Sequence, residues 1–177
     1  MVWVPATILC IRFPFLYPRN RFTDKPSHLI PSWTELDALD TGWRKAFGIQ
    51  ICRELKRALL EDGGRKKLRR YRITQIKEKY GALCWYDQGG NEETNKILAK
   101  YEYISEHTCI VCGKAADYVT KGWIEPYCKE HLPDHIDPND PEMVDTYYTK
   151  ECPFYGRYRI SFHKKEPEDD GKEPTGD

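Results

Sequence analysis

The sequence has no excess of charge of either sign, because 28 lysines and arginines balance 28 aspartates and glutamates in a chain of 177 residues. A neutral chain has no global field that would draw it to nucleic acid or to a membrane, so such binding has to come from a local cluster of charge. The sequence also lacks an internal repeat, a P-loop, a Ser-His-Asp set and a paired-carboxylate signature. We therefore assign no catalytic residue.

No hydrophobic run reaches the length of about 20 residues that a membrane-spanning helix needs. The apolar opening, residues 1–10, also lacks the basic start and the small-residue cleavage site of a secretory signal. We interpret this opening as a first strand or as an N-terminal packing arm. The sequence thus predicts a cytoplasmic protein that makes no contact with a membrane.

The most informative pattern is two pairs of soft metal ligands, Cys109 with Cys112 and Cys128 with His131, in which two residues separate the members of each pair. This spacing is typical of zinc sites, because one turn of backbone directs both side chains of a pair at the same ion. Four protein ligands fill a tetrahedral shell, so we predict one structural Zn²⁺ with no open position. His135 is an alternative fourth ligand, but the spacing of His131 mirrors that of the first pair.

The remaining cysteines, Cys10, Cys52, Cys84 and Cys152, show no pairing pattern and lie in apolar or aromatic settings. A free thiol in such a setting behaves as a small buried hydrophobe. This usage favours a reducing compartment. The alternative to zinc is two disulfides or a set of unrelated thiols, which the coincidence of two ligand spacings disfavours.

Hydrophobic spacing predicts two helices in the first third of the chain. A capping box at Ser32 and Glu35 starts a short helix that ends near Leu39. A longer helix runs from about residue 41 to about residue 60, and the glycines at 63–64 end it. Its apolar stripe, which we assign to the core, consists of Phe47, Ile51, Leu55 and Leu59.

Beyond that helix we predict a β-hairpin that turns at residues 78–81, a helix that Asn91 caps, and a small hairpin at residues 118–124. The fold class is therefore α+β, a small antiparallel sheet with packed helices and a treble-clef-like or zinc-ribbon-like zinc module. Changes in composition divide the chain into an α+β core with an N-terminal arm, the zinc module, an aromatic β extension and a disordered acidic tail: residues 1–107, 108–133, 134–163 and 164–177.

One local cluster breaks the overall neutrality, since residues 65–79 hold eight cations and a single acid. Tyr71, Tyr80 and Trp85 lie in or beside this stretch, and we expect them to stack on bases. The stretch therefore predicts contacts with nucleic acid, and the alternative is a solvated helix end followed by an exposed hairpin face. The predicted contacts are Arg65, Lys66, Lys67, Arg69, Arg70, Arg72, Lys77 and Lys79.

Several motifs, taken in their order along the chain, resemble those of one family. They are the Gly-Trp pair at 42–43, the hairpin IKEKYGALCWY at 76–86, the CxxC motif at 109–112, the Gly-Trp pair at 122–123 and the CxxH motif at 128–131. In this order and spacing they resemble a family of small uncharacterised bacteriophage and prophage proteins, and the match covers roughly half of the chain. The resemblance implies a phage origin, a zinc site and a host cytoplasm, but it implies no reaction.

Two functions follow from these patterns, and a third is weighed beside them. The first is a phage-type accessory protein that binds nucleic acid through the basic stretch. The alternative is a protein-binding inhibitor of a bacterial host or defence enzyme, an anti-defence protein such as an anti-CRISPR, which would use the acidic tail and the aromatic residues of the extension, Tyr147, Tyr148, Phe154, Tyr155 and Tyr158. The third is a treble-clef nuclease, whose candidates for a further metal site are His107, His131, His135, Asp134 and Asp137. Between nucleic acid and a host protein the sequence does not choose, and it indicates no oligomeric state.

Overall fold

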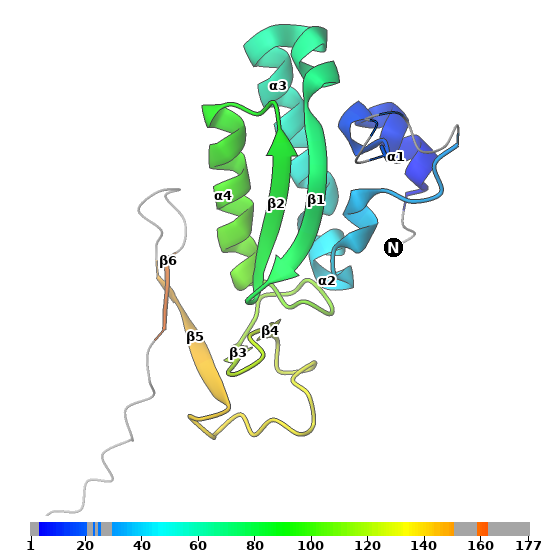
Figure 1. The fold of residues 1–177 in the computed structure, drawn as a ribbon. Coiled ribbons are helices and arrows are strands. Elements are labelled where there is room, and N and C mark those ends of the chain that lie inside the picture. Colours follow the sequence, from blue (N-terminus) through cyan, green and yellow to red (C-terminus); the bar gives the residue numbers. More distant parts are fainter. Residues whose placement is uncertain (1–3, 21–22, 24, 26–29, 151–158, 163–177) are drawn as a thin grey trace, which may run out of the picture.

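The computed structural model describes residues 4–20, 23, 25, 30–150 and 159–162, and it confirms the predicted α+β class (Figure 1). Two long helices and a two-stranded ribbon lie together in one part of the molecule, beside the short N-terminal helices. A smaller four-stranded sheet lies beyond the turn of the ribbon, and the zinc pattern falls in the segments around its first two strands.

The helical elements are α1 (Ala6–Arg12), η1 (Pro14–Leu16), η2 (Glu35–Ala38), α2 (Thr41–Trp43), η3 (Arg44–Gly48), α3 (Ile49–Arg70) and α4 (Glu92–Glu106). The strands are β1 (Arg72–Lys79), β2 (Ala82–Gln88), β3 (Tyr118–Thr120), β4 (Pro126–Tyr127), β5 (Val144–Lys150) and β6 (Arg159–Phe162). All pairings are antiparallel, with β1 and β2 in the ribbon and the order β4-β3-β5-β6 in the second sheet. No helix in these ranges is long and apolar enough to cross a membrane.

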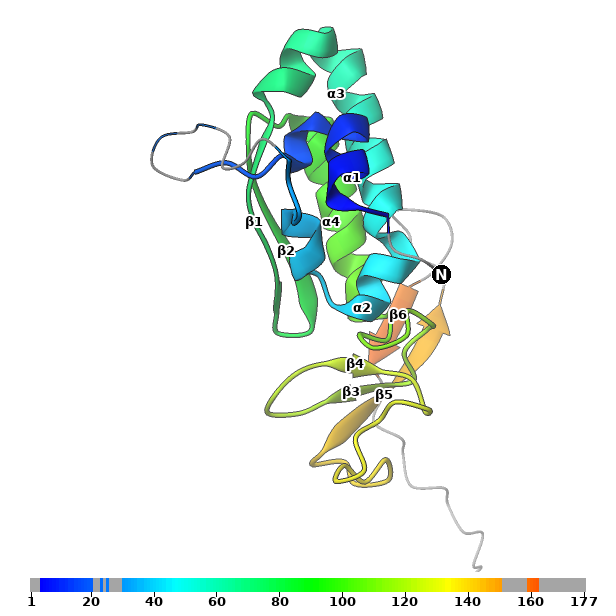
Figure 2. The ribbon, with the colours of Figure 1, turned by 90° about the vertical axis from the view of Figure 1, so that its right-hand side faces the viewer.

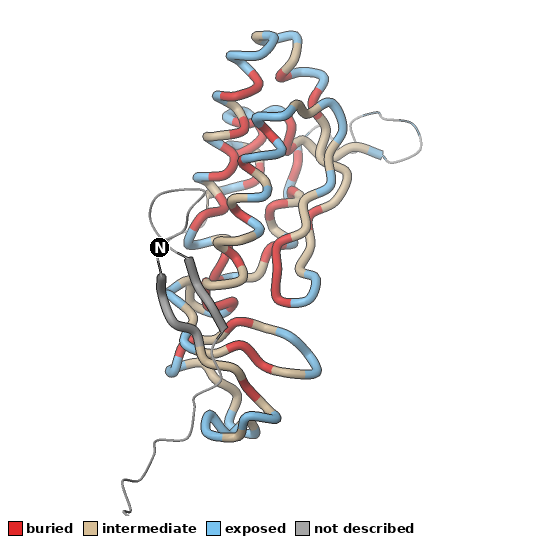
Figure 3. The backbone as a smooth tube through the Cα atoms, turned by 90° about the vertical axis from the view of Figure 1, so that its left-hand side faces the viewer, coloured by how far each residue is buried: buried red, intermediate tan, exposed pale blue. Residues whose placement is uncertain are grey.

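The N-terminal segment packs on the core as an arm, but as a helix and not as the strand that was the other interpretation. Leu9 and Cys10 of α1 are buried, and Phe13 follows them into the same cluster. A continuous apolar run cannot by itself distinguish a strand from a buried helical turn. The core that the arm joins contains side chains from every described helix and both ribbon strands, among them Leu36, Trp43, Ile51, Leu55, Tyr71, Ile76, Leu83 and Tyr101. Figure 3 marks the buried positions of the chain in red.

α2, the π-helical segment η3 and α3 follow one another without a break, so the long helix begins at residue 41 as predicted. All four residues of its predicted apolar stripe are buried. Its predicted end is wrong. Gly63 and Gly64 leave helical geometry, with φ of 60° at Gly64, but the chain resumes the helix and continues to Arg70. The resumed turns have an apolar anchor, since Leu68 is buried, and Lys67 forms an ion pair with Asp62 across the kink at 3.0 Å. The first six residues of the basic stretch are therefore helical.

The ribbon confirms the predicted hairpin and is longer than expected. Tyr80 and Gly81 both have positive φ, 55° and 76°, as in the two-residue turn that suits the twist of paired strands. The ribbon packs against α4 through β2 and against η1 and η2 through β1, with α3 farther from it (Figure 2), and it buries Ile76 and Leu83. A register shift between Ile73 and Gln75 marks a bulge near the start of β1.

The capping signals were partly correct. Asn91 caps α4 as predicted, and its Oδ1 accepts the N–H of Thr94 at 2.8 Å. At the short helix, however, the capping box uses Thr34 and Asp37 in place of the predicted pair two residues earlier. The Glu35 carboxylate instead accepts the N–H of Ile76 from β1 at 3.4 Å, because the helix starts later and turns this side chain toward the ribbon.

The two long helices are joined by a polar contact at their interface. Glu54 of α3 accepts hydrogen bonds from the ammonium of Lys100 at 2.6 Å and from the hydroxyl of Tyr101 at 2.9 Å, both on α4. Hydrogen bonds from Lys100, Gln50 and Tyr101 overcome the opposing effect of burial and lower the pKa of the Glu54 carboxyl. This carboxylate is therefore an ionised contact within the helical core.

The C-terminal extension forms strands where the structure describes it. β5 pairs with β3 and β6 pairs with β5, so the extension predicted at residues 134–163 contains strands at 144–150 and 159–162. Residues 151–158 and the acidic tail from 163 onward lie outside the described residues. The predictions that concern Phe154, Tyr155, Tyr158 and the tail therefore stay predictions.

Candidate functional site

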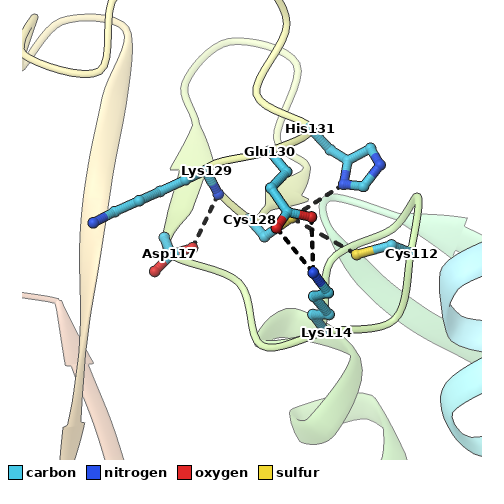
Figure 4. A network of polar contacts seen from close by, with 7 residues as sticks. All are labelled: Cys112, Lys114, Asp117, Cys128, Lys129, Glu130 and His131. Atoms are coloured by element: carbon cyan, nitrogen blue, oxygen red, sulfur yellow. Dashed lines mark hydrogen bonds and ion pairs between the residues drawn. The ribbon is translucent and has the colours of Figure 1, made fainter.

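The two predicted ligand pairs converge on one point. One ligand atom from each of Cys109, Cys112, Cys128 and His131 lies within 4.8 Å of all the others. Figure 4 shows part of this group, in which Cys128 Sγ lies 3.7 Å from Cys112 Sγ and 3.1 Å from His131 Nδ1. Zn–S bonds of about 2.3 Å at tetrahedral angles place two sulfurs about 3.8 Å apart. The donor set and its spacing fit one structural Zn²⁺.

The first ligand pair lies on a tight turn that its own backbone closes. The N–H of Gly113 donates to the carbonyl of Cys109 at 2.9 Å, and the N–H of Cys109 donates to the carbonyl of Lys114 at 2.8 Å. Gly113 adopts φ of 82°, which a side chain would disfavour. We call residues 109–114 the knuckle. The second pair is closed in the same way, because the N–H of His131 donates to the carbonyl of Cys128 at 3.0 Å.

The hairpin between the pairs fixes their separation. Within this predicted hairpin β3 pairs with β4, and the N–H of Ile110 donates to the carbonyl of Pro126 at 3.0 Å. The carboxylate of Asp117 accepts the backbone N–H of Lys129 at 3.0 Å (Figure 4). The backbone therefore brings the second pair beside the knuckle, and the four ligand atoms meet without a long flexible segment between them.

The knuckle is seated on the start of the helical core through Gly42 and Trp43. The N–H of Gly42 donates to the carbonyl of Ile110 at 2.8 Å, and the buried indole N–H of Trp43 donates to the carbonyl of Thr108 at 2.8 Å. A Cβ atom on Gly42 would lie only 2.2 Å from the carbonyl oxygen of Cys109. The Gly-Trp pair at residues 42–43 thus holds the knuckle against the helical core. The sequence motif alone did not reveal this role.

The thiols of Cys109 and Cys128 differ in their proton affinities. Burial raises the pKa of the Cys109 thiol, but hydrogen bonds from backbone N–H groups of Cys128, Cys112 and Val111 outweigh it and lower this pKa below its usual value. Burial, together with the neighbouring thiols, raises the pKa of Cys128 to about 11. Zn²⁺ deprotonates a coordinating thiol outright, so a bound ion would hold all three ligand cysteines as thiolates.

Lys114 links the two halves of the site from outside. Its ammonium contacts both carboxylate oxygens of Glu130, at 2.9 and 2.8 Å, and this pairing raises the pKa of Lys114 (Figure 4). Both side chains are mostly exposed, so the contact contributes little to stability. The side chain of Lys129 points away from the ligands in the same view.

The remaining histidine and acidic candidates for a further metal site have other surroundings. His107 follows the end of α4, and its Nδ1 lies 2.7 Å from the carbonyl oxygen of Tyr103. Burial lowers the pKa of this imidazole. Asp134, His135 and Asp137 are exposed, and none of them joins the ligand group. The nitrogen that meets the three sulfurs is that of His131, as predicted.

The eight predicted nucleic-acid contacts separate into two places. Arg65, Lys66, Arg69 and Arg70 are exposed at the end of α3, and we call these four residues the helix-end cluster. Lys67, in contrast, is half-buried against Asp62. The other three cations lie on β1, whose eight residues extend for about 23 Å at 3.3 Å per residue. Lys77 and Lys79 are thus at the far end of the ribbon from the cluster.

Tyr71 and Trp85, two of the three aromatic residues expected to stack on bases, face the interior of the protein. Tyr71 is fully buried, and its hydroxyl donates to Asp87 at 2.6 Å. The indole N–H of Trp85 in turn donates to the hydroxyl of Tyr71 at 3.2 Å. Tyr80 alone is well exposed, at 73%, and it lies at the turn. Successive residues of a strand point to opposite faces, so part of this set faces the core. The composition of the stretch does not show which part.

Comparison with protein-family models, with curated proteins and with solved structures gives no match. The resemblance to bacteriophage and prophage proteins therefore stays a prediction. What the chain does has to be inferred from its metal site and its surfaces.

Proposed function

We propose that this chain is a zinc-stabilised, phage-type accessory protein that binds nucleic acid through the helix-end cluster. The observation that carries the proposal is that four exposed cations stand together and none makes an ion pair within the part of the chain that the structure describes. Unpaired cations repel one another, and an anionic partner removes that repulsion. The phosphate backbone of a nucleic acid presents such charges at regular intervals.

The spacing of the cluster suits a row of phosphates. Positions 65, 66, 69 and 70 cover an arc of about 140° on a helix, and the centre of this arc points about 130° away from buried Leu68. The cluster extends for about 7.5 Å along the axis at 1.5 Å per residue, and phosphates of one strand follow each other at about 3.4 Å along a duplex. Cations in the last turn also stabilise a helix through its macrodipole. The test must therefore separate binding from stability.

The decisive variant is Arg69→Glu combined with Arg70→Glu. Binding of a labelled 20-nucleotide DNA, single-stranded or duplex, is followed by fluorescence anisotropy between 50 and 200 mM salt, with melting measured in parallel. Four phosphate contacts on duplex DNA predict a slope of log K against log salt of about −3.6, which the variant reduces by about 2. Affinity at 50 mM salt should fall at least tenfold.

The matched control carries the same change of charge elsewhere. Lys45 and Lys129 are exposed on the zinc-site side of the fold, so the Lys45→Glu and Lys129→Glu double variant should bind as the parent does. Zinc content is measured for both double variants. If the parent protein shows no binding at 50 mM salt, or if the control weakens it equally, the proposal fails.

A different observation favours the alternative, a protein that binds and inhibits a host or defence enzyme. Tyr80 and Trp123 are 73% and 76% exposed on the tips of the two hairpins, and Gly81 and Ile124 bring these tips into contact. The two-residue turn, in which Tyr80 has positive φ, places this residue at the tip of its hairpin. Exposed aromatic residues are enriched in protein interfaces.

Native mass spectrometry of the protein purified from a bacterial host separates the two functions. Under the inhibitor hypothesis a host protein co-purifies and is lost from the Tyr80→Ala and Trp123→Ala double variant. Under the nucleic-acid proposal the co-purifying mass is removed by nuclease and is lost instead from the helix-end variant. Retention of a nuclease-resistant protein by the helix-end variant would favour the inhibitor.

A further inference from the structure

Acidic and basic side chains of the ribbon lie on opposite faces. Opposite residues in an antiparallel pair share a face, and successive residues alternate. Ile76 and Leu83 are buried on the helix side, and Asp87 bonds to buried Tyr71 on that side. The register then places both acids of the ribbon, Glu78 and Asp87, on the helix side. The outer face, by the same register, carries Gln75, Lys77, Lys79, Cys84, Tyr86 and Gln88.

This acid-free face also has a cation beside an exposed ring. Lys77 pairs in register with Cys84, and its ammonium lies 5.3 Å from the ring centre of Tyr86. Tyr86 is 44% exposed. A ring with a lysine next to it offers one surface for a base and one charge for the phosphate of the same nucleotide.

A groove lies over the other end of the same face. It has a volume of 680 Å³, within the range of about 300–1,000 Å³ in which proteins bind small ligands. Gln75, Tyr86 and Gln88 of the outer face line it from the ribbon, and residues 17–20 and 32–33 line it from the N-terminal segment. Trp33 is 44% exposed, so two accessible aromatic rings border one groove.

The groove adjoins the helix-end cluster along the chain. β1 begins two residues after Arg70, and Arg72 is itself part of the groove lining. Glu35 is the one acid among the described residues of the lining, and its carboxylate accepts the N–H of Ile76. A phosphate backbone held on the cluster therefore continues onto a face with amides for base edges and rings for stacking.

We propose that this groove takes unpaired bases, with Tyr86 and Trp33 as stacking rings, so that the protein prefers single-stranded to duplex nucleic acid. The inference rests on the proposed function and adds the form of nucleic acid that is bound. In a duplex the bases are stacked on one another and cannot enter the groove, whereas the cluster contacts the phosphates of either form.

The test compares a 12-nucleotide single strand with a duplex of the same length, by anisotropy at one low salt concentration. The parent should bind the single strand more tightly. The Trp33→Ala and Tyr86→Ala double variant should lose at least tenfold in affinity for the single strand and keep its affinity for the duplex, since base stacking on an aromatic ring is sequence-tolerant and strong. The Trp33→Phe and Tyr86→Phe double variant retains rings and should retain the preference.

Ile11→Ala is the control, because Ile11 is 83% exposed on α1, outside the groove lining, and has no part in either proposed binding surface. It should leave both affinities unchanged. A parent with no single-strand preference, or a Trp33→Ala and Tyr86→Ala variant that binds the single strand normally, overturns the inference. The proposed function survives either result if Arg69→Glu with Arg70→Glu still weakens both forms. Absence of binding to both forms overturns the two proposals together.

Discussion

The zinc site and the helical core are held together by different means. The core buries large apolar side chains from α1, η1, α3, α4 and both ribbon strands in one cluster. The zinc site has few such side chains, and its described geometry consists of tight turns, short strands and four converging ligands. Burial of apolar side chains is sufficient to stabilise the helical core. The zinc site is too small to form such a core and needs a metal to stabilise it. The two regions meet where the knuckle lies against Gly42 and Trp43, and again where the hairpin tips touch at Gly81 and Ile124.

The largest expected effect is that of losing the metal. Cys112→Ser removes one of four ligands, and structural zinc sites supply on the order of 10 kcal/mol of apparent binding energy that is linked to folding. We expect loss of zinc and unfolding of residues 108–133, with a lower melting temperature for the core because the knuckle no longer supports Trp43. Metal analysis and thermal melting by circular dichroism, with and without chelator, provide the measurement. Unchanged zinc content together with unchanged melting would refute the assignment.

A smaller effect should follow from separating the two regions while the ligands stay intact. In Gly42→Ala the new methyl group lies 2.2 Å from the carbonyl oxygen of Cys109, so the knuckle has to move. We expect destabilisation of about 3 kcal/mol, in the range of overpacked cores. Gly48→Ala is the matched control, because its nearest neighbours are 3.6–3.8 Å away and alanine favours a helix. Equal denaturant midpoints for the two variants would show that the contact is unimportant.

The smallest effect concerns the core alone. The Glu54 carboxyl has a lowered pKa in the folded chain, so its ionised form contributes stability above the unfolded pKa of about 4.3, and this contribution is lost as the pH falls through the folded value. Glu54→Gln should cost about 1–2 kcal/mol at pH 7. The stability curves of parent and variant should converge below about pH 4. Parallel curves from pH 7 to pH 3 would contradict this assignment.

Local signals in the sequence were sufficient for the zinc ligands, because their spacing depends only on the turn between two residues. The hairpin turn at residues 78–81 and the cap at Asn91 are equally local. Two glycines, in contrast, predicted a helix end at residues 63–64. The chain instead resumes the helix, and Leu68 in the resumed turns is buried in the core. Tertiary packing here overrides local propensity.

Surface chemistry was harder to predict than the metal site. The cations of the basic stretch are neighbours in the sequence. In the structure they lie in two places, because the chain changes from helix to strand at residue 71. Tyr71 and Trp85 read as exposed stacking residues and are instead bonded to each other in the interior. Which face of a strand a residue occupies depends on register, and a bulge near the start of β1 shifts that register.

The bond from Trp43 to Thr108 joins residues 65 positions apart. At a synthesis rate of about 5–20 residues per second, Thr108 is added to the chain about 3–13 seconds after Trp43. The knuckle and its zinc partners, which are close in sequence, are completed only after that. A ribosome-bound chain would therefore carry a helical core in which the Trp43 indole N–H has no acceptor, and the segment that leads into the metal site would supply it.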